Sequence, residues 1–381
     1  MPVQWTLRLA IAALVLLLPL LGAQADDVEL TERFAGALKN WGLHNTVGPS
    51  DIKILPAWKI SQGDSKIIVA IIDTGLDINH PDLRQNLWTG VENVRVGDRS
   101  VPQTIHGWDF VTQSPITSDA HGHGTHVAGI IGARFNPSKG VAGVSQHVAL
   151  MPLRYYSPAN TGRQNLENSI KALHFAIDHG AQIINYSGGG PQFSEAEFLA
   201  LKRAEEKGIL VVCAAGNEHQ NTDLVQNYYY PAAYGLSNII SVAAIDVSGK
   251  LIASSNFGKH KVDLAAPGEN IFSTLPKGRY GTMTGTSQGT PHVAGVAQLL
   301  KSLNPSLTPS EVKARILASV DQLPGLKEKV RSGGKLNAYK ALQSLGIQRP
   351  ENRSLLQVTD LPTSVLERVI ATDAKNTQSA H

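Results

Sequence analysis

Runs of apolar residues along this chain alternate with segments whose apolar residues recur at helical spacing. Six short runs are apolar almost continuously, rather than at every second position. Continuous hydrophobicity of this kind is typical of strands that are covered on both faces. The predicted strands occupy residues 66–72, 148–155, 181–186, 209–215, 238–245 and 262–265.

Amphipathic helices are predicted between and after these strands. They cover residues 168–180, residues 194–207, residues 288–303 and a segment that begins after residue 308. Ser194 is followed three residues later by Glu197, which is a capping-box pattern. Thr308 and Glu311 repeat that pattern, with a proline at the first helical position. The third segment is apolar nearly all round, which predicts a buried central helix.

The alternation of strands and helices predicts an α/β fold. Its centre should be a mainly parallel sheet flanked by helices on both faces. Ligand sites in such sheets lie at the carboxyl ends of the strands. Polar residues that follow the predicted strands are therefore the first candidates for function.

The two ends of the chain differ from this pattern. Arg8 precedes an apolar run over residues 9–21, and Ala23-Gln24-Ala25 matches an A-x-A cleavage signature. We therefore expect a signal peptide over 1–25, a short amino-terminal segment over 26–49, the folded domain over 50–345 and a tail over 346–381, for which disorder is the simplest expectation. The apolar run is short for a membrane span, although an uncleaved anchor is the alternative. Cleavage would give a secreted or periplasmic protein with no stable membrane anchor.

Composition narrows the classes of partner. The 381 residues are 42% apolar and 17% charged, with a formal net charge of +3. No block of Lys and Arg stands out, so nucleic acid is not an expected partner. The single cysteine, Cys213, cannot form a disulfide within the chain, and its apolar neighbours predict a core position.

A serine stands where a glycine-rich segment meets the predicted central helix. Gly285-Thr286-Ser287 leads into that helix. The start of a helix carries unpaired N–H groups and a partial positive charge, which suit an anionic intermediate. We expect Pro291 in the first turn, where a missing N–H costs little.

Further polar residues follow other predicted strands. Asp73 ends the first strand, just before Gly75, although an acid there is often only a turn residue. A buried amide at Asn217, after the strand 209–215, could donate to a developing oxyanion, and a structural turn residue is the alternative. His123 can accept a proton near neutral pH.

Taken together, these motifs resemble the subtilisin-like serine proteases, or subtilases. The matching words are Ile72-Asp73-Thr74-Gly75, His123-Gly124-Thr125-His126-Val127-Ala128-Gly129, Ala215-Gly216-Asn217 and Gly285-Thr286-Ser287. The resemblance extends from about Trp41 to Leu342. It implies that 50–345 is a subtilisin-like catalytic domain and that the protein is a serine endopeptidase. With the predicted signal peptide, we expect an exported enzyme.

The resemblance assigns roles to four residues. Ser287 would be the nucleophile of an acyl-enzyme mechanism, His123 the general base and Asp73 the group that orients the imidazole. Asn217 and the backbone N–H of Ser287 would form the oxyanion hole. The substrates would be polypeptides, the chemistry would need no cofactor, and we expect a monomer.

The resemblance also places the substrate. An extended peptide would add as a strand along Ser187, Gly188 and Gly189. Ala215 and Gly216 are further expected substrate-binding residues. The family usually has a larger residue than Gly188, so this wall should be more open. Tyr229 stands where glycine is frequent at the base of the first specificity pocket, and a tyrosine there would shorten the pocket.

A structural calcium ion is a further implication. Asp82 matches a ligand position of many subtilases, and the segment from Asn136 to Val141 resembles their calcium loop, although it is longer and contains Lys139. A calcium site needs several oxygen ligands, so a metal-free loop is the alternative.

Two other functions compete with the protease. His121, His123 and His126 are spaced in a way that also suits a metal-dependent hydrolase, in which Ser287 would be dispensable. A catalytically weak family member that acts as a binding module is the other alternative. Within the subtilase interpretation, His126 is expected to pack in the core.

Overall fold

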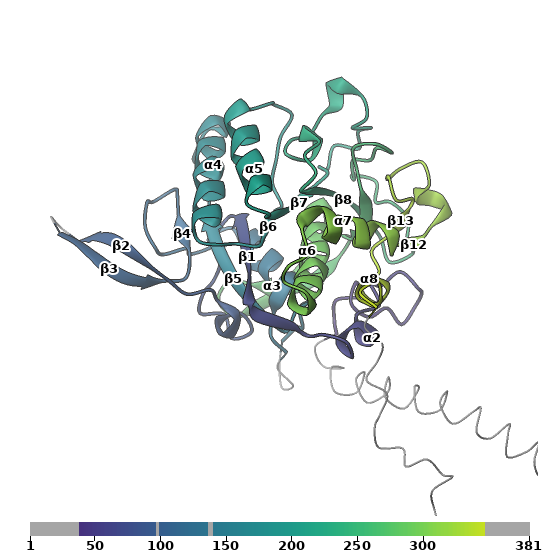
Figure 1. Cartoon of the computed structure of the whole chain (residues 1–381), viewed down its shortest axis with the longest axis horizontal. Coiled ribbons are helices and arrows are strands. Elements are labelled where there is room, and N and C mark those ends of the chain that lie inside the picture. Colours follow the sequence, from purple (N-terminus) through teal and green to yellow (C-terminus); the bar gives the residue numbers. More distant parts are fainter. Residues whose placement is uncertain (1–37, 97–98, 136–139, 347–381) are drawn as a thin grey trace, which may run out of the picture. The chain divides into compact units, whose positions relative to one another are not determined.

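A large, mostly parallel sheet forms the centre of the protein. The computed structural model describes residues 38–96, 99–135 and 140–346 (Figure 1). Within these ranges the sheet has nine strands in the order β12-β13-β9-β8-β7-β6-β1-β5-β4. All neighbours from β13 to β4 are parallel, and only β12 runs antiparallel to its neighbour. The strands are β1 Gly63–Asp73, β4 Trp108–Asp109, β5 His147–Arg154, β6 Ile183–Tyr186, β7 Leu210–Ala214, β8 Ile239–Ile245, β9 Leu264–Pro267, β12 Asp321–Gln322 and β13 Gly334–Lys335.

Helices cover both faces of this sheet, as the sequence predicts (Figure 1). The α-helices are α2 Ile54–Trp58, α3 His123–Gly132, α4 Gly162–Asp178, α5 Glu195–Glu206, α6 Thr286–Leu303, α7 Pro309–Ala318 and α8 Ala338–Gln343. Short 3-10 helices occupy Arg84–Asn86, Val225–Asn227, Ala232–Tyr234 and Pro324–Leu326.

Strand β1 shows why its sequence is continuously apolar. Val69 and Ile71 belong to the core that contains residues of α3 and α6. Ala70 and Ile72 belong to a second core, which contains residues of α4 and α5. Successive side chains of a strand point to opposite faces, so a strand between two helical layers must be apolar at every position. Cys213 on β7 is fully buried in the second core, as predicted.

The predicted helix starts differ in how they are capped. Thr308 and Glu311 form the complete capping box. At α5 the Ser194 side chain accepts from the Glu197 N–H, but the Glu197 carboxylate turns inward and accepts from the hydroxyls of Tyr186 and Tyr234. The prediction of a full box at Ser194 is therefore wrong. Burial raises the pKa of Glu197, although the two hydroxyl groups oppose that shift.

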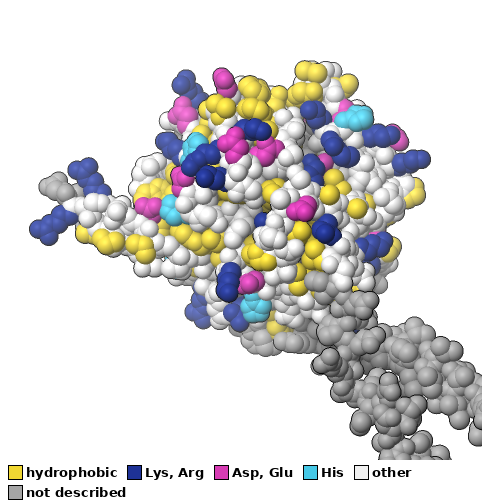
Figure 2. Space-filling model, viewed as in Figure 1, with side chains coloured by type: hydrophobic (Ala, Val, Ile, Leu, Met, Phe, Trp, Pro, Cys, Tyr) yellow, Lys and Arg dark blue, Asp and Glu magenta, His cyan; other side chains and the backbone are white. Residues whose placement is uncertain are grey.

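Two hairpins have no counterpart among the predicted strands. They are β2 Gly90–Val96 with β3 Arg99–Ile105, and β10 Ile271–Leu275 with β11 Arg279–Met283. The first projects from the side of the sheet near β4 (Figure 1). Val91 on it is 67% exposed, so this hairpin lacks the buried faces that make a strand recognisable in a sequence. On the face drawn in Figure 2, basic and acidic side chains are interspersed.

The described part of the amino-terminal segment packs against the domain. Leu43 is buried in the core, and Trp41 Nε1 donates to the Glu269 carbonyl oxygen at 2.8 Å. The predicted signal peptide (1–25), the rest of the amino-terminal segment and nearly all of the predicted tail lie outside the described residues, so the segment boundaries stay predictions. Among the described helices, none is both long and apolar enough to cross a membrane.

Two of the fully buried histidines are His126 on α3 and His292 on the central helix α6. His126 is fully buried, as predicted, and its Nε2 lies 2.9 Å from the Ile271 carbonyl oxygen, while its Nδ1 is buried without a hydrogen-bond partner. His292 pairs Nδ1 with the Gln288 carbonyl oxygen at 2.8 Å and Nε2 with Asn40 Nδ2 at 3.1 Å. Burial lowers the pKa of each ring to about 4.

These histidines predict a loss of stability in acid. Between pH 6.5 and pH 4 the unfolded chain binds protons that the folded protein excludes, so the free energy of unfolding falls as the pH falls. Each ring accounts for roughly 3 kcal/mol, which is present above pH 6.5 and lost by pH 4. Urea unfolding across this range, in a Ser287→Ala background that prevents self-digestion, measures the effect. We expect His292→Gln to flatten the pH dependence and the exposed His260→Gln to leave it unchanged; equal slopes in both would contradict the assignment.

Candidate active site

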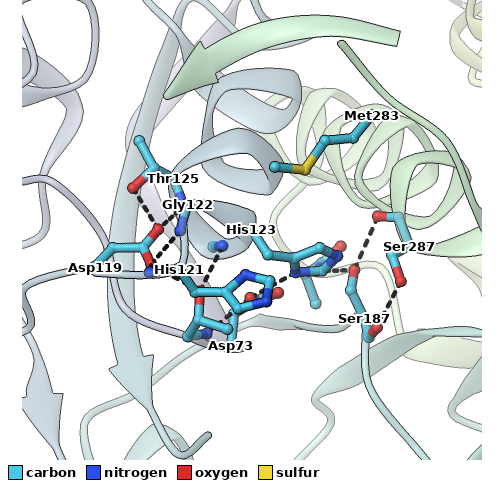
Figure 3. A network of polar contacts seen from close by, with 12 residues as sticks. Asp73, Asp119, His121, Gly122, His123, Thr125, Ser187, Met283 and Ser287 are labelled. Carbon is cyan, nitrogen blue, oxygen red and sulfur yellow. Dashed lines mark hydrogen bonds and ion pairs between the residues drawn. The ribbon is translucent and has the colours of Figure 1, made fainter. Parts of the chain in front are cut away.

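The candidate residues meet at the carboxyl edge of the sheet. Strand β1 lies between β5 and β6, so the direction of strand addition reverses around it, and such reversals mark ligand sites. Asp73 is the last residue of β1, and Ser187 directly follows β6. His123 begins α3, and Ser287 is the second residue of α6. In Figure 3 the His123 ring lies between Asp73 on one side and Ser187 with Ser287 on the other.

Asp73 fixes the orientation of the His123 ring. Its Oδ1 lies 2.7 Å from His123 Nδ1 and also accepts from the Thr74 N–H at 2.7 Å. Gly124 permits the close approach of α3 to β1, because a Cβ there would lie 2.1 Å from the Gly75 carbonyl oxygen. Burial lowers the pKa of His123, but the charge and hydrogen bond of Asp73, with the charge of Asp119, outweigh this and raise that pKa above 6.5.

Asp119 organises the turn that carries His123, and sequence reasoning missed it. One of its oxygens accepts from the N–H groups of His121 and Gly122 and from the Thr74 hydroxyl (Figure 3). The other accepts from the N–H and hydroxyl of Thr125. Burial raises the pKa of Asp119, but hydrogen bonds from Thr125, Gly122 and Thr74 outweigh burial and lower that pKa. The sequence held one signal for this role. Asp119 stands three residues before Gly122, the glycine at the N-cap of α3.

Asp119→Asn should therefore alter catalysis through His123. Loss of the negative charge lowers the pKa of the imidazole, so kcat/KM should persist to lower pH. Loss of charged hydrogen bonds should also reduce kcat/KM at its optimum by roughly 10- to 100-fold. A pH profile of kcat/KM separates the two effects, since a purely structural role would leave the acid limb where it is. An unshifted limb would contradict the electrostatic coupling of Asp119 to His123.

Ser287 and Ser187 are joined by reciprocal hydrogen bonds. Ser287 Oγ donates to the Ser187 carbonyl oxygen at 2.8 Å, and Ser187 Oγ donates to the Ser287 carbonyl oxygen at 3.1 Å. Pro291 explains the second bond. It is the sixth residue of α6, not part of the first turn as predicted, and it has no N–H for the carbonyl four residues earlier. That carbonyl belongs to Ser287, and the Ser187 hydroxyl satisfies it instead.

Asn217 lies beside the start of α6. Its Oδ1 accepts from the Thr286 N–H at 2.9 Å and from the Thr286 hydroxyl at 3.2 Å. Because the oxygen is held in this way, Nδ2 is the donor that remains for a ligand. The prediction of a buried amide at Asn217 is wrong, since the residue is exposed. Thr286, which holds the Asn217 side chain through these two contacts, is a second residue that the sequence analysis did not assign.

The predicted substrate-binding residues border the same edge. Gly188 does not leave an open wall, contrary to expectation, because a Cβ there would lie 2.1 Å from the Tyr155 hydroxyl oxygen. Tyr155 fills that space from the end of β5. Gly189 and Gly216 both lie against the ring of Tyr229, and Ala215 is fully buried.

A hollow of about 180 Å³ opens next to the His123 ring. Its lining residues are Asp73, Thr74, His121, His123, Tyr155, Tyr156, Ser187 and Gly188. The hollow therefore adjoins the orienting carboxylate, the imidazole and the strand end at Ser187 together.

The three histidines do not form a metal site. His126 is buried against the Ile271 carbonyl oxygen, whereas His121 is exposed. In the described part of the chain, no three His, Cys, Asp or Glu side chains converge in a way that could hold a metal ion. The arrangement thus disfavours the metal-dependent hydrolase.

Of the predicted calcium site, Asp82 and Val141 lie among the described residues. Asp82 Oδ2 accepts from the Tyr280 hydroxyl at 2.9 Å and from the Val141 N–H at 3.1 Å. Its Oδ1 is buried and has no hydrogen-bond partner. Asn136 lies outside the described residues.

A carboxylate, an imidazole and a helix-start serine at the edge of a parallel sheet are the groups of a serine hydrolase. The model of the subtilase family matches residues 64–342, and the chain belongs to this family. It is a subtilisin-like serine protease, and such enzymes act on polypeptides without a cofactor for the chemistry.

Known proteins agree with this assignment. The chain is 36% identical to thermitase from Thermoactinomyces vulgaris over 296 residues, which cover 78% of this chain and 95% of thermitase. It is 37% identical to the major intracellular serine protease of Bacillus subtilis (strain 168), over 71% of this chain and 81% of that protein. A solved protease from Pseudoalteromonas arctica PAMC 21717 superposes with a TM-score of 0.64 at 26% identity, over 81% of this chain and 98% of that one.

Proposed function

We propose that this subtilase is an exported endopeptidase that cleaves through an acyl-enzyme intermediate, with Asp73, His123 and Ser287 as its catalytic triad. The observation that carries the proposal is the 2.7 Å contact between Asp73 and His123, with Ser287 at the start of α6 on the other side of the ring. The catalytically weak alternative has no support in this arrangement, since all four assigned side chains are present.

In the first chemical step, the Ser287 hydroxyl would exchange one hydrogen-bond acceptor for another. That hydroxyl donates to the Ser187 carbonyl oxygen. A substrate that adds as a strand would offer its own N–H to that carbonyl, and Ser287 Oγ–H could then turn to His123 Nε2. His123 would take the proton as Oγ attacks the peptide carbonyl carbon, and would then return it to the leaving amine. Water would release the acyl group by the same route.

Charge on the substrate oxygen would be stabilised by two donors. Asn217 Nδ2 is left free by the contacts of Thr286 with Oδ1. The backbone N–H of Ser287 lies in the first turn of α6, where helix N–H groups have no partner within the helix. Donors fixed before the reaction need no reorganisation as the charge develops.

The remaining features of the proposal concern location and assembly. The pattern of residues 1–25 supports export to the periplasm or the exterior. The mixed surface charge in Figure 2 gives no support to a nucleic-acid partner, and we propose a monomer. Cell fractionation of the full-length chain, with amino-terminal sequencing of the product, tests export; a full-length cytoplasmic protein would contradict it.

Endopeptidase activity has a direct test. A peptide blocked at both ends should be cut internally, and an ester substrate should give a burst of product equal to the concentration of active sites. Cleavage only at free ends, or steady release without a burst, would contradict the corresponding part of the proposal.

The proposal includes a structural calcium ion, bound by Asp82. The buried Oδ1 without a partner suits a cation, and calcium accepts carboxylate and carbonyl oxygens. In the Ser287→Ala background, calcium at 100 times its Kd should stabilise the fold by about 2.7 kcal/mol, seen as a higher melting temperature than in chelator. Asp82→Asn should abolish that increase. Identical melting curves with calcium and with chelator would contradict the site.

A further inference from the structure

Two segments define where a bound acyl-side residue must lie. Ser187 and the glycines after it follow β6, and Gly216 with Asn217 follows the neighbouring parallel strand β7, so the two segments lie side by side at the carboxyl edge of the sheet and would form the two walls of the space. A carbonyl group attacked by Ser287 and held by Asn217 would sit between them. The side chain of the residue that supplies this carbonyl would therefore enter the space between Gly189 and Gly216.

The ring of Tyr229 already occupies that space. A Cβ at Gly189 would lie 2.6 Å from Tyr229 Cε1 and 3.1 Å from Cζ. A Cβ at Gly216 would lie 2.9 Å from Cδ2, on the opposite edge of the same ring. The ring thus spans the gap between the two walls, and each wall has a glycine where it meets the ring.

The backbone on both sides of Tyr229 is fixed. Tyr230 exchanges two hydrogen bonds with Gly190, at 2.8 and 2.9 Å, and the Tyr229 carbonyl oxygen accepts from the Ala233 N–H at 2.8 Å. The half-buried ring is therefore held at the floor of the space by a chain segment that is bonded to one of its walls. Burial, with the charge of Glu218, raises the pKa of the Tyr229 hydroxyl, so the ring stays neutral.

We propose that Tyr229 is the specificity-determining residue of this protease and restricts it to substrates with alanine or glycine on the acyl side of the cleaved bond. This inference rests on the proposed endopeptidase function. A large aromatic or branched side chain has no space between Gly189 and Gly216 unless the ring is removed. Small side chains avoid this conflict and leave the backbone pairing at Ser187 intact.

Four-residue p-nitroanilide substrates that differ only in the last residue test the proposal. We expect wild-type kcat/KM for alanine to exceed that for phenylalanine by at least about 10²-fold, given what pocket contacts can discriminate. Tyr229→Gly should raise kcat/KM for phenylalanine by a similar factor and reduce the alanine preference. Tyr228→Gly is the matched control, because Tyr228 is the neighbouring tyrosine and its ring instead contacts Lys261. It should keep the wild-type preference.

Active-site titration with a fluorophosphonate gives the concentration of competent enzyme in each sample. Labelled wild-type enzyme that cleaves the phenylalanine substrate as well as the alanine substrate would overturn the specificity proposal alone. Labelled Tyr229→Gly enzyme that keeps the alanine preference would also overturn it. Folded wild-type protein that does not label would overturn the proposed function itself.

Discussion

Replacement of Ser287 by alanine is expected to lower kcat for peptide hydrolysis by about 10⁶-fold, the size of the loss measured in the relative subtilisin. The reason is the loss of the hydroxyl that lies in the first turn of α6 and contacts the strand end at Ser187. The fold should persist, because the residue is not part of the apolar core. The rate of p-nitroaniline release from a p-nitroanilide substrate measures the loss. Circular dichroism shows how much of each sample is folded, so that the rates can be compared for equal amounts of folded protein.

Ser302→Ala is the matched control for this variant. Ser302 lies at the other end of the same helix and donates to the Leu299 carbonyl oxygen. It should retain activity within a factor of about two, as expected for a substitution far from the site. A Ser287→Ala protein with activity near that of Ser302→Ala would show that another residue attacks the substrate.

Asp73→Asn should produce the second largest loss, about 10⁴-fold in kcat, as for the corresponding change in other triads. Asp73 Oδ1 orients His123 through Nδ1, and its negative charge stabilises the imidazolium formed during attack. The neutral amide removes that charge. The acid limb of the pH profile should also move to lower pH, because the charge that raises the pKa of His123 is gone.

Asp77→Asn provides the comparison. Asp77 lies four residues further along the same loop, where its oxygens accept from the N–H groups of Asn79 and Lys277 rather than from an imidazole. This variant should keep most of the activity and an unshifted acid limb. If Asp73→Asn behaved like Asp77→Asn, the orienting role of Asp73 would be wrong.

The sequence predicts the buried strands and the polar residues at their carboxyl ends well, and the reason is physical. Strands buried on both faces must be continuously apolar, so β1 and β7 stand out. Asp73 is the last residue of β1, and Asn217 comes three residues after the end of β7. The exposed β2–β3 hairpin carries no such signal. Ser194 shows a further limit, since the local pattern could not show that Glu197 prefers the buried hydroxyls of Tyr186 and Tyr234.

Contacts between distant segments account for what the sequence did not predict at the site. Tyr155 fills the space beside Gly188, and the Ser187 hydroxyl satisfies the Ser287 carbonyl that Pro291 leaves free. Neither contact has a local pattern, because the partners lie on different strands and helices. The motifs identify which residues belong to the site. The protonation and orientation of these residues, and the space beside them for a substrate, depend on the packed fold.

The proposed mechanism depends above all on Ser287 as the nucleophile of this protease. A fluorophosphonate labelling experiment, followed by proteolytic digestion and mass spectrometry of the peptide that contains residues 285–291, tests it most directly. We expect one adduct per chain, on Ser287, and none when His123 is replaced by alanine in folded protein. An adduct on any other residue, or undiminished labelling of Ser287→Ala, would contradict it.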